Sequence, residues 1–395
     1  MKICICSFTG FQSLSGSNLR VFHLTNELIR RGNDIRFITP GREAAKSCTE
    51  RFGVDAADVG IEISRFRKSK FRLYPVFAWK ARKKVPRDSE LVFGQSLPAA
   101  LAVRLSRVSC RKAVDYVDLW SEYWRYDHKN LKGALTYPLL RKAESFSLKK
   151  QDVVFTITSR IAQMLAERGC DDRRIRIVRD GVDTKMFRPK RVGGGFYGKY
   201  GLDREEYIVY QGGIGVWDGV QFLVEAAPLV LKEHPEIRFL IVGDGPYAPV
   251  IRDAVKRMGL EKSFIFTGWV PYEDMPNFMN ISRINVVPIP DAPCTQGVLT
   301  LKLFEAMACG VPTVIGDLPG VREHVKDRTT ACLARSESRE SLSSAINSMI
   351  SDKGLYRRIR QNDLKAAPYY DWREIAKDMA DAMTEATLSC QKTPC

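Results

Sequence analysis

Two charged side chains lie in the otherwise largely apolar stretch from Gly297 to Val314, and their types and spacing suit chemistry. Lys302 and Glu305 are three positions apart, in a run whose apolar residues recur at spacings of three and four, which predicts a short helix. Gly310 and Pro312 suit the end of that helix, since glycine accepts a left-handed conformation and proline cannot continue a helix. Charges on so apolar a helix need a reason, because burying a charge is costly.

The loop before this helix is predicted to bind an anion. Gly297, Val298, Leu299 and Thr300 form a short segment of mostly small or apolar residues directly before the helical pattern. The free N–H groups of the first turn and the positive end of the helix dipole point toward such a segment. Helix starts of this kind bind phosphate groups. The alternative is an ordinary capped helix with Lys and Glu on its surface.

The elements that position these residues are expected to belong to two domains. The chain has 395 residues, which is too long for one ordinary core. Strand-like runs at 2–7, 34–39 and 91–93 alternate with helical patterns such as 19–31, as in a parallel sheet. The rhythm restarts after Lys190, with strands expected at 208–211, 238–242, 263–267, 285–288 and 313–315 and helices at 222–232 and 248–258. Two Rossmann-like α/β domains are therefore predicted.

The segment from Arg188 to Leu202 is expected to be a flexible, exposed connection, because it contains three consecutive glycines beside charged residues. We therefore predict an N-terminal domain at 1–190 and a C-terminal domain at 191–368. Residues 369–395 form the last segment, which includes an amphipathic helical pattern at 372–387.

Composition narrows the class of protein. No uninterrupted apolar run approaches the roughly 20 residues that span a bilayer. The first seven residues predict a strand rather than a signal peptide, so export is not expected. Ten cysteines without a Cys-x-x-Cys pair suggest neither zinc nor disulfides, which suits a reducing cytosol. We expect a cytoplasmic protein that needs no metal or other cofactor.

Positive charge is concentrated in the first half of the chain. Residues 1–191 hold 39 of the 62 Lys and Arg residues but only 20 of the 46 Asp and Glu residues. The densest part, from Arg65 to Arg87, interleaves aromatic and basic residues without an acidic one. This mixture suits an anionic membrane surface at the inner face of the membrane. The predicted membrane patch comprises Arg65, Arg67, Lys68, Lys70, Arg72, Trp79, Lys80, Arg82, Lys83 and Lys84.

Several segments together resemble the family 4 glycosyltransferases. A loop followed by Lys-Leu-Phe-Glu-Ala-Met-Ala-Cys-Gly-x-Pro is similar to the donor-site helix of that family. The segments 179–189, 242–246 and 266–270 also resemble family motifs, in the family's order. The resemblance extends over nearly the whole chain. It implies the GT-B fold, in which two Rossmann-like domains face a central cleft and the terminal helix returns to the first domain.

The resemblance implies how a nucleotide-sugar donor is bound. Glu305 would hold the ribose hydroxyls, and the loop from Gly297 to Thr300 would meet the diphosphate and the sugar. The remaining donor residues implied by the motifs are Gly16, Gly213, Gly243, Asp244, Gly245, Trp269 and Val270.

Three positions depart from the family pattern. Gly213 stands where an Arg is common and Asp218 where a Lys is common, and both family residues neutralise the diphosphate. Gly297 stands where the first Glu of a Glu-x7-Glu pattern would fall. Lys302 is the nearest substitute for the missing cations, so we expect it to stabilise the leaving phosphate.

A second group of residues is expected to bind the acceptor. The segment from Asp115 to Trp124 resembles the Asp-Leu-Trp-Pro-Glu segment of surface-glycan transferases. On a helical turn, Asp118 and Glu122 could face one pocket, where Asp118 could act on an acceptor hydroxyl. Capping of a helix is the alternative. Further expected acceptor residues are Ser15, Arg20 and Tyr123, although the first loop is equally consistent with a plain β–α turn.

The resulting hypothesis is a retaining transferase that moves a sugar to a lipid-linked or surface-glycan acceptor. The family's front-side mechanism uses the leaving diphosphate to deprotonate the acceptor, and no metal-binding Asp-x-Asp occurs in the chain. Electrostatic stabilisation by the helix starts and closure about Gly193 would then supply catalysis. Two alternatives remain: an isomerase similar to a nucleotide-sugar 2-epimerase, and a non-catalytic polyanion-binding protein. Nucleic acid is not the expected partner, and the oligomeric state is left open.

Overall fold

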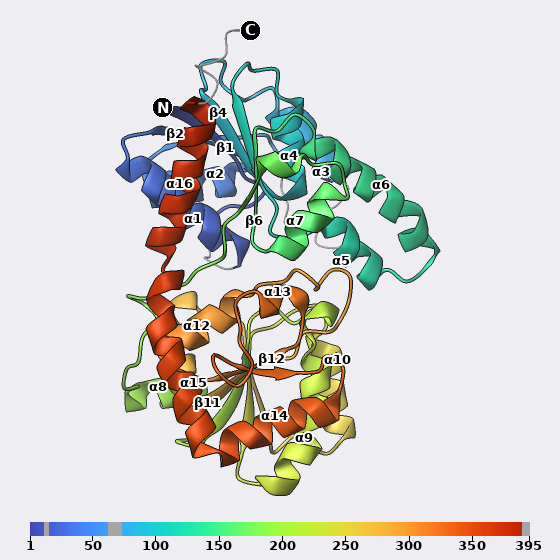
Figure 1. Cartoon of the computed structure of the whole chain (residues 1–395), viewed down its shortest axis with the longest axis vertical. Coiled ribbons are helices and arrows are strands. Elements are labelled where there is room, and N and C mark those ends of the chain that lie inside the picture. Colours follow the sequence, from blue (N-terminus) through green and yellow to red (C-terminus); the bar gives the residue numbers. More distant parts are fainter. Residues whose placement is uncertain (12–15, 62–72, 389–395) are drawn as a thin grey trace. The chain divides into compact units, whose positions relative to one another are not determined.

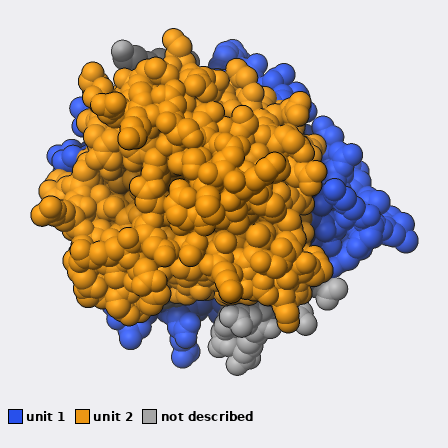
Figure 2. All heavy atoms as spheres, turned by 90° about the horizontal axis from the view of Figure 1, so that it is seen from below, with its two compact units in different colours: residues 1–180, 372–395 blue, residues 181–371 orange. Residues whose placement is uncertain are grey.

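The computed structural model describes residues 1–11, 16–61 and 73–388, which form two compact units (Figures 1 and 2). Unit 1 comprises residues 1–180 and 372–395, and unit 2 comprises residues 181–371. Each unit contains one parallel sheet, which confirms the prediction of two Rossmann-like α/β units. In both sheets the strand order runs outward in two directions from an early strand, so right-handed crossovers place helices on both faces.

Unit 1 has a seven-stranded sheet of order β3-β2-β1-β4-β5-β6-β7. Its strands are β1 (Lys2–Cys6), β2 (Asp34–Thr39), β3 (Asp55–Asp58), β4 (Leu91–Gln95), β5 (Arg111–Asp115), β6 (Val153–Thr156) and β7 (Ile175–Ile177). Its helices are α1 (Ser17–Arg30), α2 (Arg42–Phe52), α3 (Leu73–Ala81), α4 (Ser96–Leu105), α5 (Trp120–Asp127), α6 (Leu131–Leu148), α7 (Ser159–Ala166) and α16 (Trp372–Leu388).

Unit 2 has a six-stranded sheet of order β10-β9-β8-β11-β12-β13. Its strands are β8 (Tyr207–Gln211), β9 (Arg238–Val242), β10 (Phe264–Gly268), β11 (Ser282–Val287), β12 (Thr313–Gly316) and β13 (Cys332–Ala334). Its helices are α8 (Gly194–Tyr200), α9 (Val220–Glu233), α10 (Ala248–Arg257), α11 (Met275–Asn280), α12 (Leu301–Cys309), α13 (Pro319–Arg322), α14 (Arg339–Ser351) and α15 (Lys353–Ala366).

The central strands are mainly apolar and mostly buried because helices cover both faces of a parallel sheet. In unit 1, Ile3 of β1 pairs with Ile35 of β2 on one side and with Leu91 of β4 on the other. In unit 2, Ile208 of β8 pairs with Phe239 of β9, and both belong to the buried core. This packing fixes the carboxyl ends of the strands, where the loops that carry the predicted site begin.

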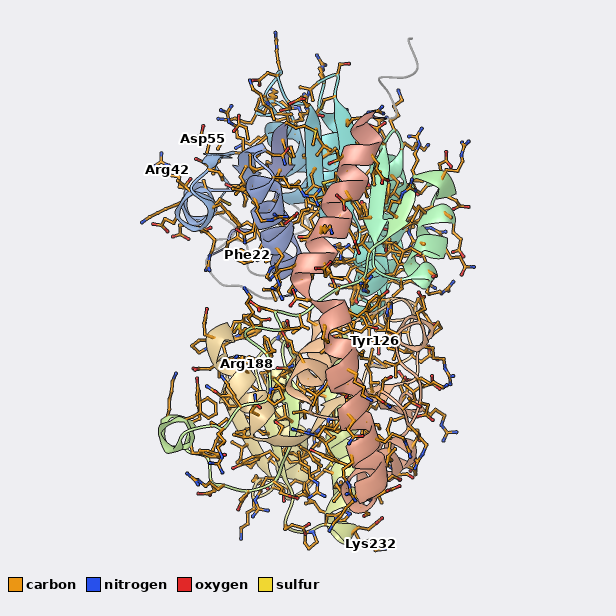
Figure 3. The ribbon with its side chains drawn as sticks, turned by 60° about the vertical axis from the view of Figure 1, so that its left-hand side comes forward. Phe22, Arg42, Asp55, Tyr126, Arg188 and Lys232 are labelled. Atoms are coloured by element: carbon orange, nitrogen blue, oxygen red, sulfur yellow. The ribbon has the colours of Figure 1, made fainter. Side chains whose placement is uncertain are left out.

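Aromatic residues join α1 to its neighbours in unit 1. Phe22, which Figure 3 labels, lies against the ring of Phe52 with centroids 5.5 Å apart. On α16, the ring of Trp372 stacks on His23 at 5.2 Å, and Asp381 forms an ion pair with Arg31. The C-terminal helix therefore packs on α1, beside which it runs in Figure 1.

The division between the units differs from the boundaries expected at residues 190 and 368. The units divide after Asp180 and after Asp371 instead. The segment from Arg188 to Leu202 contains the helix α8, and its Phe196 ring packs on Phe278 of α11 with centroids 4.8 Å apart. The segment therefore lies within unit 2 and does not connect the two units, because aromatic residues that follow the glycine run pack on α11.

Among the described residues, no helix combines the length and the apolar character needed to cross a membrane. Of the predicted membrane patch, Arg65, Arg67, Lys68, Lys70 and Arg72 lie outside the described residues. Trp79 is half exposed on α3, and the Lys83 ammonium lies 3.9 Å from the centre of its ring.

The other described members of the patch have their own contacts. Lys80 donates to the carbonyl oxygen of Val59 at 3.1 Å, and the Arg82 guanidinium lies 5.8 Å from the ring of Trp79. Lys84 is exposed. These cations gather about one helix end, and nothing in these contacts specifies a ligand.

Candidate functional site

The predicted donor residues of unit 2 follow the carboxyl ends of its strands. One loop follows β8 at Gly212–Gly215, a second follows β9 at Gly243–Gly245, and a third follows β10 at residues 269–270. A fourth, longer loop follows β11 and leads into α12. Since the strands are parallel, all four loops lie at one edge of the sheet, where α/β folds place their ligands.

Backbone packing explains two of the predicted glycines. A Cβ atom on Gly243 would lie 2.0 Å from the carbonyl oxygen of Gly212, and one on Gly245 would lie 2.5 Å from that of Ile214. The Ile214 N–H also donates to the carbonyl oxygen of Asp244 at 3.0 Å. The loops after β8 and β9 are therefore pressed together backbone to backbone, and larger residues would separate them.

Gly213 is different, because a Cβ atom there would meet no other atom within 4 Å. The backbone at this position is not left-handed, so an L side chain is compatible with it. Neither the backbone conformation nor the space around Cβ therefore requires glycine at this position.

Glu305 lies on α12 with its carboxylate buried and hydrogen-bonded at both oxygens. Its Oε1 atom accepts from the Tyr272 hydroxyl at 2.7 Å, and its Oε2 atom accepts from Nε2 of Gln211 at 2.9 Å. Burial raises the pKa of Glu305 to about 7, although Tyr272, Lys302 and Gln211 act in the opposite direction. The carboxyl group is thus fixed in place and titrates near neutral pH.

Lys302 lies one turn earlier on the same helix and already has an anionic partner. Its Nζ atom is 3.1 Å from Oδ1 of Asp218, and it lies 5.4 Å from the ring centre of Tyr210. Asp218 also accepts from the N–H of Gly215 at 2.9 Å. The lysine predicted to compensate for the missing family cations is therefore held by the acidic residue that replaces one of them.

The start of α12 is built by a compact loop. Buried Thr295 donates from Oγ1 to the carbonyl oxygen of Pro290 at 2.6 Å and accepts from the N–H of Ala292. Thr300 is the N-cap, and its hydroxyl accepts from the N–H of Lys302 at 3.4 Å. A Cβ atom on Gly320 would lie 2.7 Å from the carbonyl carbon of Gly297, so α13 packs closely on this loop.

The other residues of the predicted donor set differ in exposure. Val298 is half-buried and Leu299 is buried in the loop before α12. Trp269 is 66% exposed after β10, and Val270 is partly exposed beside it. Asp244 turns back on its own loop, because its Oδ1 atom accepts from the N–H of Gly245 at 2.8 Å.

Arg20 of unit 1 is buried rather than open to an acceptor. Its Nε atom donates to Oδ2 of Asp115 at 2.9 Å, and its Nη1 atom donates to the carbonyl oxygen of Arg179 at 2.9 Å and to Asp180 at 3.3 Å. Burial raises the pKa of Asp180 to about 7, and the charges of Asp115 and Asp118 add to that rise. Arg20 thus links α1 to the carboxyl end of β5, through Asp115, and to Arg179 and Asp180, where the first segment of unit 1 ends.

Asp118 and Glu122 do not share one helical turn, because α5 begins only at Trp120. Asp118 accepts from the Tyr123 hydroxyl at 3.1 Å. Glu122 is buried and forms an ion pair with Arg168 at 2.5 Å. The two carboxylates therefore have different partners, and Glu122 is part of an internal network.

Two further predictions concern the first loop. Gly16 directly precedes α1 with a φ of 48°, a conformation that favours glycine. Ser15 lies outside the described residues. In the described part of the chain, no group of three or more His, Cys, Asp or Glu side chains is arranged to hold a metal ion.

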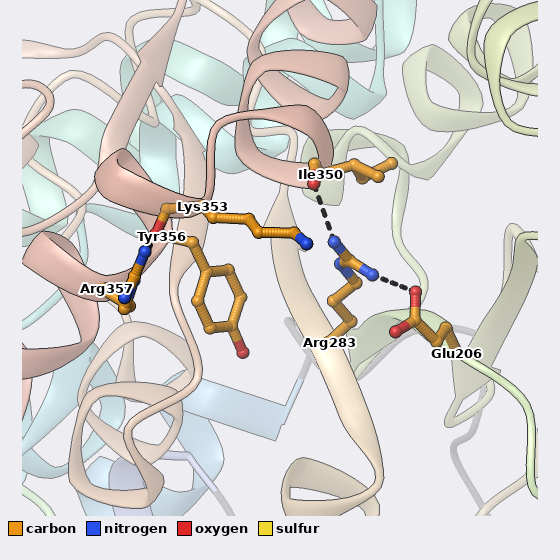
Figure 4. A pocket seen from close by; sticks show the side chains of 6 residues that line it. All are labelled: Glu206, Arg283, Ile350, Lys353, Tyr356 and Arg357. Carbon is orange, nitrogen blue, oxygen red and sulfur yellow. Dashed lines mark hydrogen bonds and ion pairs between the residues drawn. The ribbon is translucent and has the colours of Figure 1, made fainter.

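A pocket of about 330 Å³ lies elsewhere in unit 2, and Figure 4 shows its lining residues, which are Glu206, Arg283, Ile350, Lys353, Tyr356 and Arg357. It lies near the amino ends of β8 and β11, at the edge of the sheet opposite Glu305. Arg283 pairs with Glu206 and donates to the Ile350 carbonyl oxygen at 2.7 Å. The pocket is therefore separate from the predicted donor residues.

Tyr272 and Asn285 contact the candidate site but were not predicted from the sequence. Tyr272 lies in one turn of 3₁₀ helix, 33 residues before Glu305, and no motif connects the two. Buried Asn285 donates from Nδ2 to the carbonyl oxygen of Lys302 at 3.2 Å. A polar residue between the apolar residues Ile284 and Val286 of β11 was a signal that could have identified Asn285.

Comparison with known proteins assigns the chain to a family. The family model described as "Glycosyltransferase Family 4" matches residues 14–186. The family model described as "Glycosyl transferases group 1" matches residues 205–352. The two matches cover most of both halves of the chain.

Curated relatives are distant. Alpha-D-kanosaminyltransferase of Streptomyces kanamyceticus is 26% identical over 63% of this chain and 64% of its own length. The GDP-mannose-dependent alpha-(1-6)-phosphatidylinositol monomannoside mannosyltransferase of Mycolicibacterium smegmatis is 24% identical over 77% of this chain and 78% of its own length. The chain thus matches less than two thirds of the first relative and more than two thirds of the second.

The fold is shared with a solved structure that contains a nucleotide sugar. HepE of Anabaena, solved in complex with UDP-glucose, has a TM-score of 0.76, is 17% identical, and is matched over 98% of this chain and all of its own. At this identity the likeness shows the fold alone. The two family matches and this shared fold show that the chain belongs to the family 4 and group 1 glycosyltransferases, which have the GT-B fold.

Proposed function

We propose that the chain is a retaining glycosyltransferase that moves a sugar from a nucleotide-diphosphate sugar to a lipid-linked or cell-surface glycan. The observation that carries the proposal is the buried, hydrogen-bonded carboxylate of Glu305 in the middle of α12. It is an acceptor for hydroxyl donors, and it lies at the sheet edge where α/β folds bind nucleotides. The family assignment supports the same conclusion.

The donor would be held by its ribose and its diphosphate. In this proposal, Glu305 accepts hydrogen bonds from the ribose hydroxyls. The loop from Gly297 to Thr300 lies along the diphosphate, where the positive end of α12 and Lys302 stabilise negative charge. Trp269 and Val270 lie beside the base.

The proposed reaction needs no protein nucleophile. The bond between the anomeric carbon and the diphosphate oxygen breaks, and the bond to the acceptor oxygen forms on the same face. The acceptor proton passes to the leaving phosphate, and Asp118 with Tyr123 positions the acceptor. Catalysis then depends on stabilising charge on the leaving group, which a preorganised helix start does efficiently. The proposal includes no metal and no further cofactor.

The acceptor is proposed to be lipid-linked or a cell-surface glycan, and the protein to work at the inner face of the membrane. One distant relative is named for action on a phosphatidylinositol mannoside. The positive charge of the first half of the chain suits anionic lipids.

A panel of nucleotide sugars tests the proposal. The purified protein is incubated with each sugar, with and without lipid-linked acceptors, and the products are identified by mass spectrometry and NMR. Transfer only with acceptor, with retained anomeric configuration and unchanged by a chelator, is expected. A new nucleotide sugar formed without acceptor would indicate an isomerase instead. RNA retention without any nucleotide-sugar binding would indicate a polyanion-binding protein.

The Glu305→Ala variant tests the site itself. Its donor turnover is expected to fall at least tenfold, while the exposed Glu261→Ala on the same unit is expected to match the wild type. Unchanged turnover in Glu305→Ala would contradict the site but not the activity.

A further inference from the structure

Helix α6 of unit 1 exposes a row of large apolar side chains. Leu131, Leu135 and Leu139 are 76%, 66% and 65% exposed, and Phe146 near the end of the helix is 38% exposed. The leucines are four residues apart, so they lie along one side of the helix. Pro138 is exposed on the same side. A continuous apolar stripe of this kind marks an interaction surface more often than isolated exposed residues do.

The opposite side of α6 is fixed to unit 1 by a buried charge network. Glu144 is fully buried and accepts from the N–H and the hydroxyl of Ser121 at 2.8 and 2.6 Å. Arg168, which follows the end of α7, lies between Glu144 and Glu122, at 3.1 and 2.5 Å. Because this network determines which side of α6 faces inward, the leucine stripe is held outward rather than free to turn in.

A second set of contacts holds the amino end of α6. The Asn130 side chain caps the helix by accepting from the N–H of Gly133, and the Tyr137 hydroxyl donates to Glu122 at 2.9 Å. In Figure 1, α6 lies at the outer edge of unit 1. The stripe is thus presented by a rigid element.

Basic side chains flank the leucines. Lys132 and Arg141 lie about 100° and 80° from Leu131 around the helix, one on each side, and exposed Lys142 lies on the leucine side between Leu139 and Phe146. The only acidic residue of α6 is the buried Glu144. An apolar stripe between basic flanks is the pattern of helices that lie in the interface of an anionic bilayer.

We propose that the outer side of α6 docks on an anionic lipid bilayer, with Leu131, Leu135 and Leu139 inserted between the lipids. A second copy of the chain fits less well, because two such helices in contact would place Lys142 of each near like charges. Apolar insertion explains the leucines, and attraction to acidic headgroups explains the flanking cations. Docking through α6 would bring the protein to the membrane that carries the proposed acceptor. Only this role rests on the proposed function; the binding of lipid itself does not.

Vesicle flotation tests the docking surface without any nucleotide sugar, so its failure is distinct from failure of the transfer reaction. Wild-type protein is expected to bind vesicles of phosphatidylcholine with 30 mol% phosphatidylglycerol more than pure phosphatidylcholine vesicles. The triple variant Leu131→Ser, Leu135→Ser, Leu139→Ser is expected to bind at least tenfold less. The control variant Leu229→Ser, Val250→Ser, Met258→Ser changes three other exposed apolar residues, which lie in unit 2 and are 37%, 44% and 43% exposed, and it is expected to bind like the wild type.

Two further measurements test insertion of α6 into the lipid and its preference for anionic lipid. Tryptophan placed by Leu135→Trp is expected to be quenched by brominated lipid beyond the wild-type level, which is informative even if the triple variant folds poorly. Lys132→Glu with Lys142→Glu is expected to remove the preference for phosphatidylglycerol. Equal binding by the triple and control variants would overturn the proposal. The proposal would also be overturned if the wild type and the control variant sediment as dimers and the triple leucine variant sediments as a monomer. That result would assign the surface to a second copy of the chain.

Discussion

The Nζ atom of Lys302 lies 3.1 Å from Oδ1 of Asp218, so the cation at the start of α12 is paired within unit 2. Asp218 stands at a position where the resemblance implies Lys, and it pairs with the one basic residue of α12. In the proposed function, a bound diphosphate must compete with Asp218 for Lys302. This relationship predicts that donor affinity is limited by an internal anion.

Asp218→Asn is expected to strengthen binding of nucleoside diphosphates about tenfold, or about 1.4 kcal/mol. The substitution removes a negative charge beside the diphosphate and releases Lys302, while Asn keeps an oxygen for the N–H of Gly215. Calorimetric titration with UDP and GDP measures the change. Weaker binding would mean that Asp218 chiefly positions Lys302. Lys302→Met is expected to weaken binding in either case, whereas Lys256→Met on the exposed side of α10 is not.

Gly213→Arg is expected to strengthen diphosphate binding by about 1.5–3 kcal/mol, the range for a hydrogen bond with a charged group. A Cβ atom at this position would meet no other atom within 4 Å, and the family commonly has Arg there. The matched control is Gly195→Arg, which also has open space and adds the same charge in α8. An equal gain in both variants would show that only net charge matters.

Donor affinity is expected to fall by about tenfold between pH 8 and pH 6, because the pKa of Glu305 is raised to about 7 by burial. Above this value the carboxylate is ionised and accepts charge-assisted hydrogen bonds from ribose; below it, one oxygen carries a proton and the remaining acceptor is weaker. Glu305→Gln is expected to bind weakly with a smaller pH dependence. The diphosphate's own ionisation affects both proteins alike, so the difference between their titration profiles reports on Glu305. Parallel profiles would contradict the prediction.

Asp363 is expected to make unit 2 less stable as the pH rises. It is buried on α15, and burial raises its pKa from 3.8 to about 8. Between these values the unfolded chain has lost the proton and the folded chain has kept it, so unfolding releases a proton and stability falls with rising pH. Below about pH 4 and above about pH 8 this contribution no longer changes.

Asp363→Asn removes that dependence. Relative to the wild type, its free energy of unfolding is expected to increase by up to about 4 kcal/mol between pH 5 and pH 8, from 1.36 kcal/mol for each pH unit. Urea unfolding at both pH values measures the difference. Asp253→Asn, at an exposed site on α10, serves as control. A pH-independent difference would show that Asp363 ionises normally in the folded protein.

Arg20→Met is expected to destabilise unit 1 by about 3–5 kcal/mol, because it leaves the buried carboxylate of Asp115 without its cation. Adding Asp115→Asn should recover part of the loss. Urea unfolding of both variants tests this. A stable Arg20→Met protein with impaired acceptor use would instead favour the acceptor role inferred from the sequence.

The sequence determined the local elements well where the apolar pattern was strong. Strands β2 and β9 were predicted with the bounds observed, and α12 was placed by its apolar spacing and by its glycine and proline end. Short, buried elements such as β13 gave too few residues for a periodic signal. The glycine run at 193–195 was misinterpreted, because the aromatic residues that anchor α8 reach a partner far along the chain.

The sequence also predicted which residues belong to the candidate site, but it did not predict which side chains contact one another there. The chain itself indicated Glu305, Lys302 and the substitutions at Gly213 and Asp218, because these depend on local motifs. Only the tertiary structure decided that Tyr272 fixes Glu305 and that Asp218 holds Lys302, 84 residues away. Such pairs form where parallel strands bring the ends of distant segments to one sheet edge, and no local pattern specifies which side chains meet there.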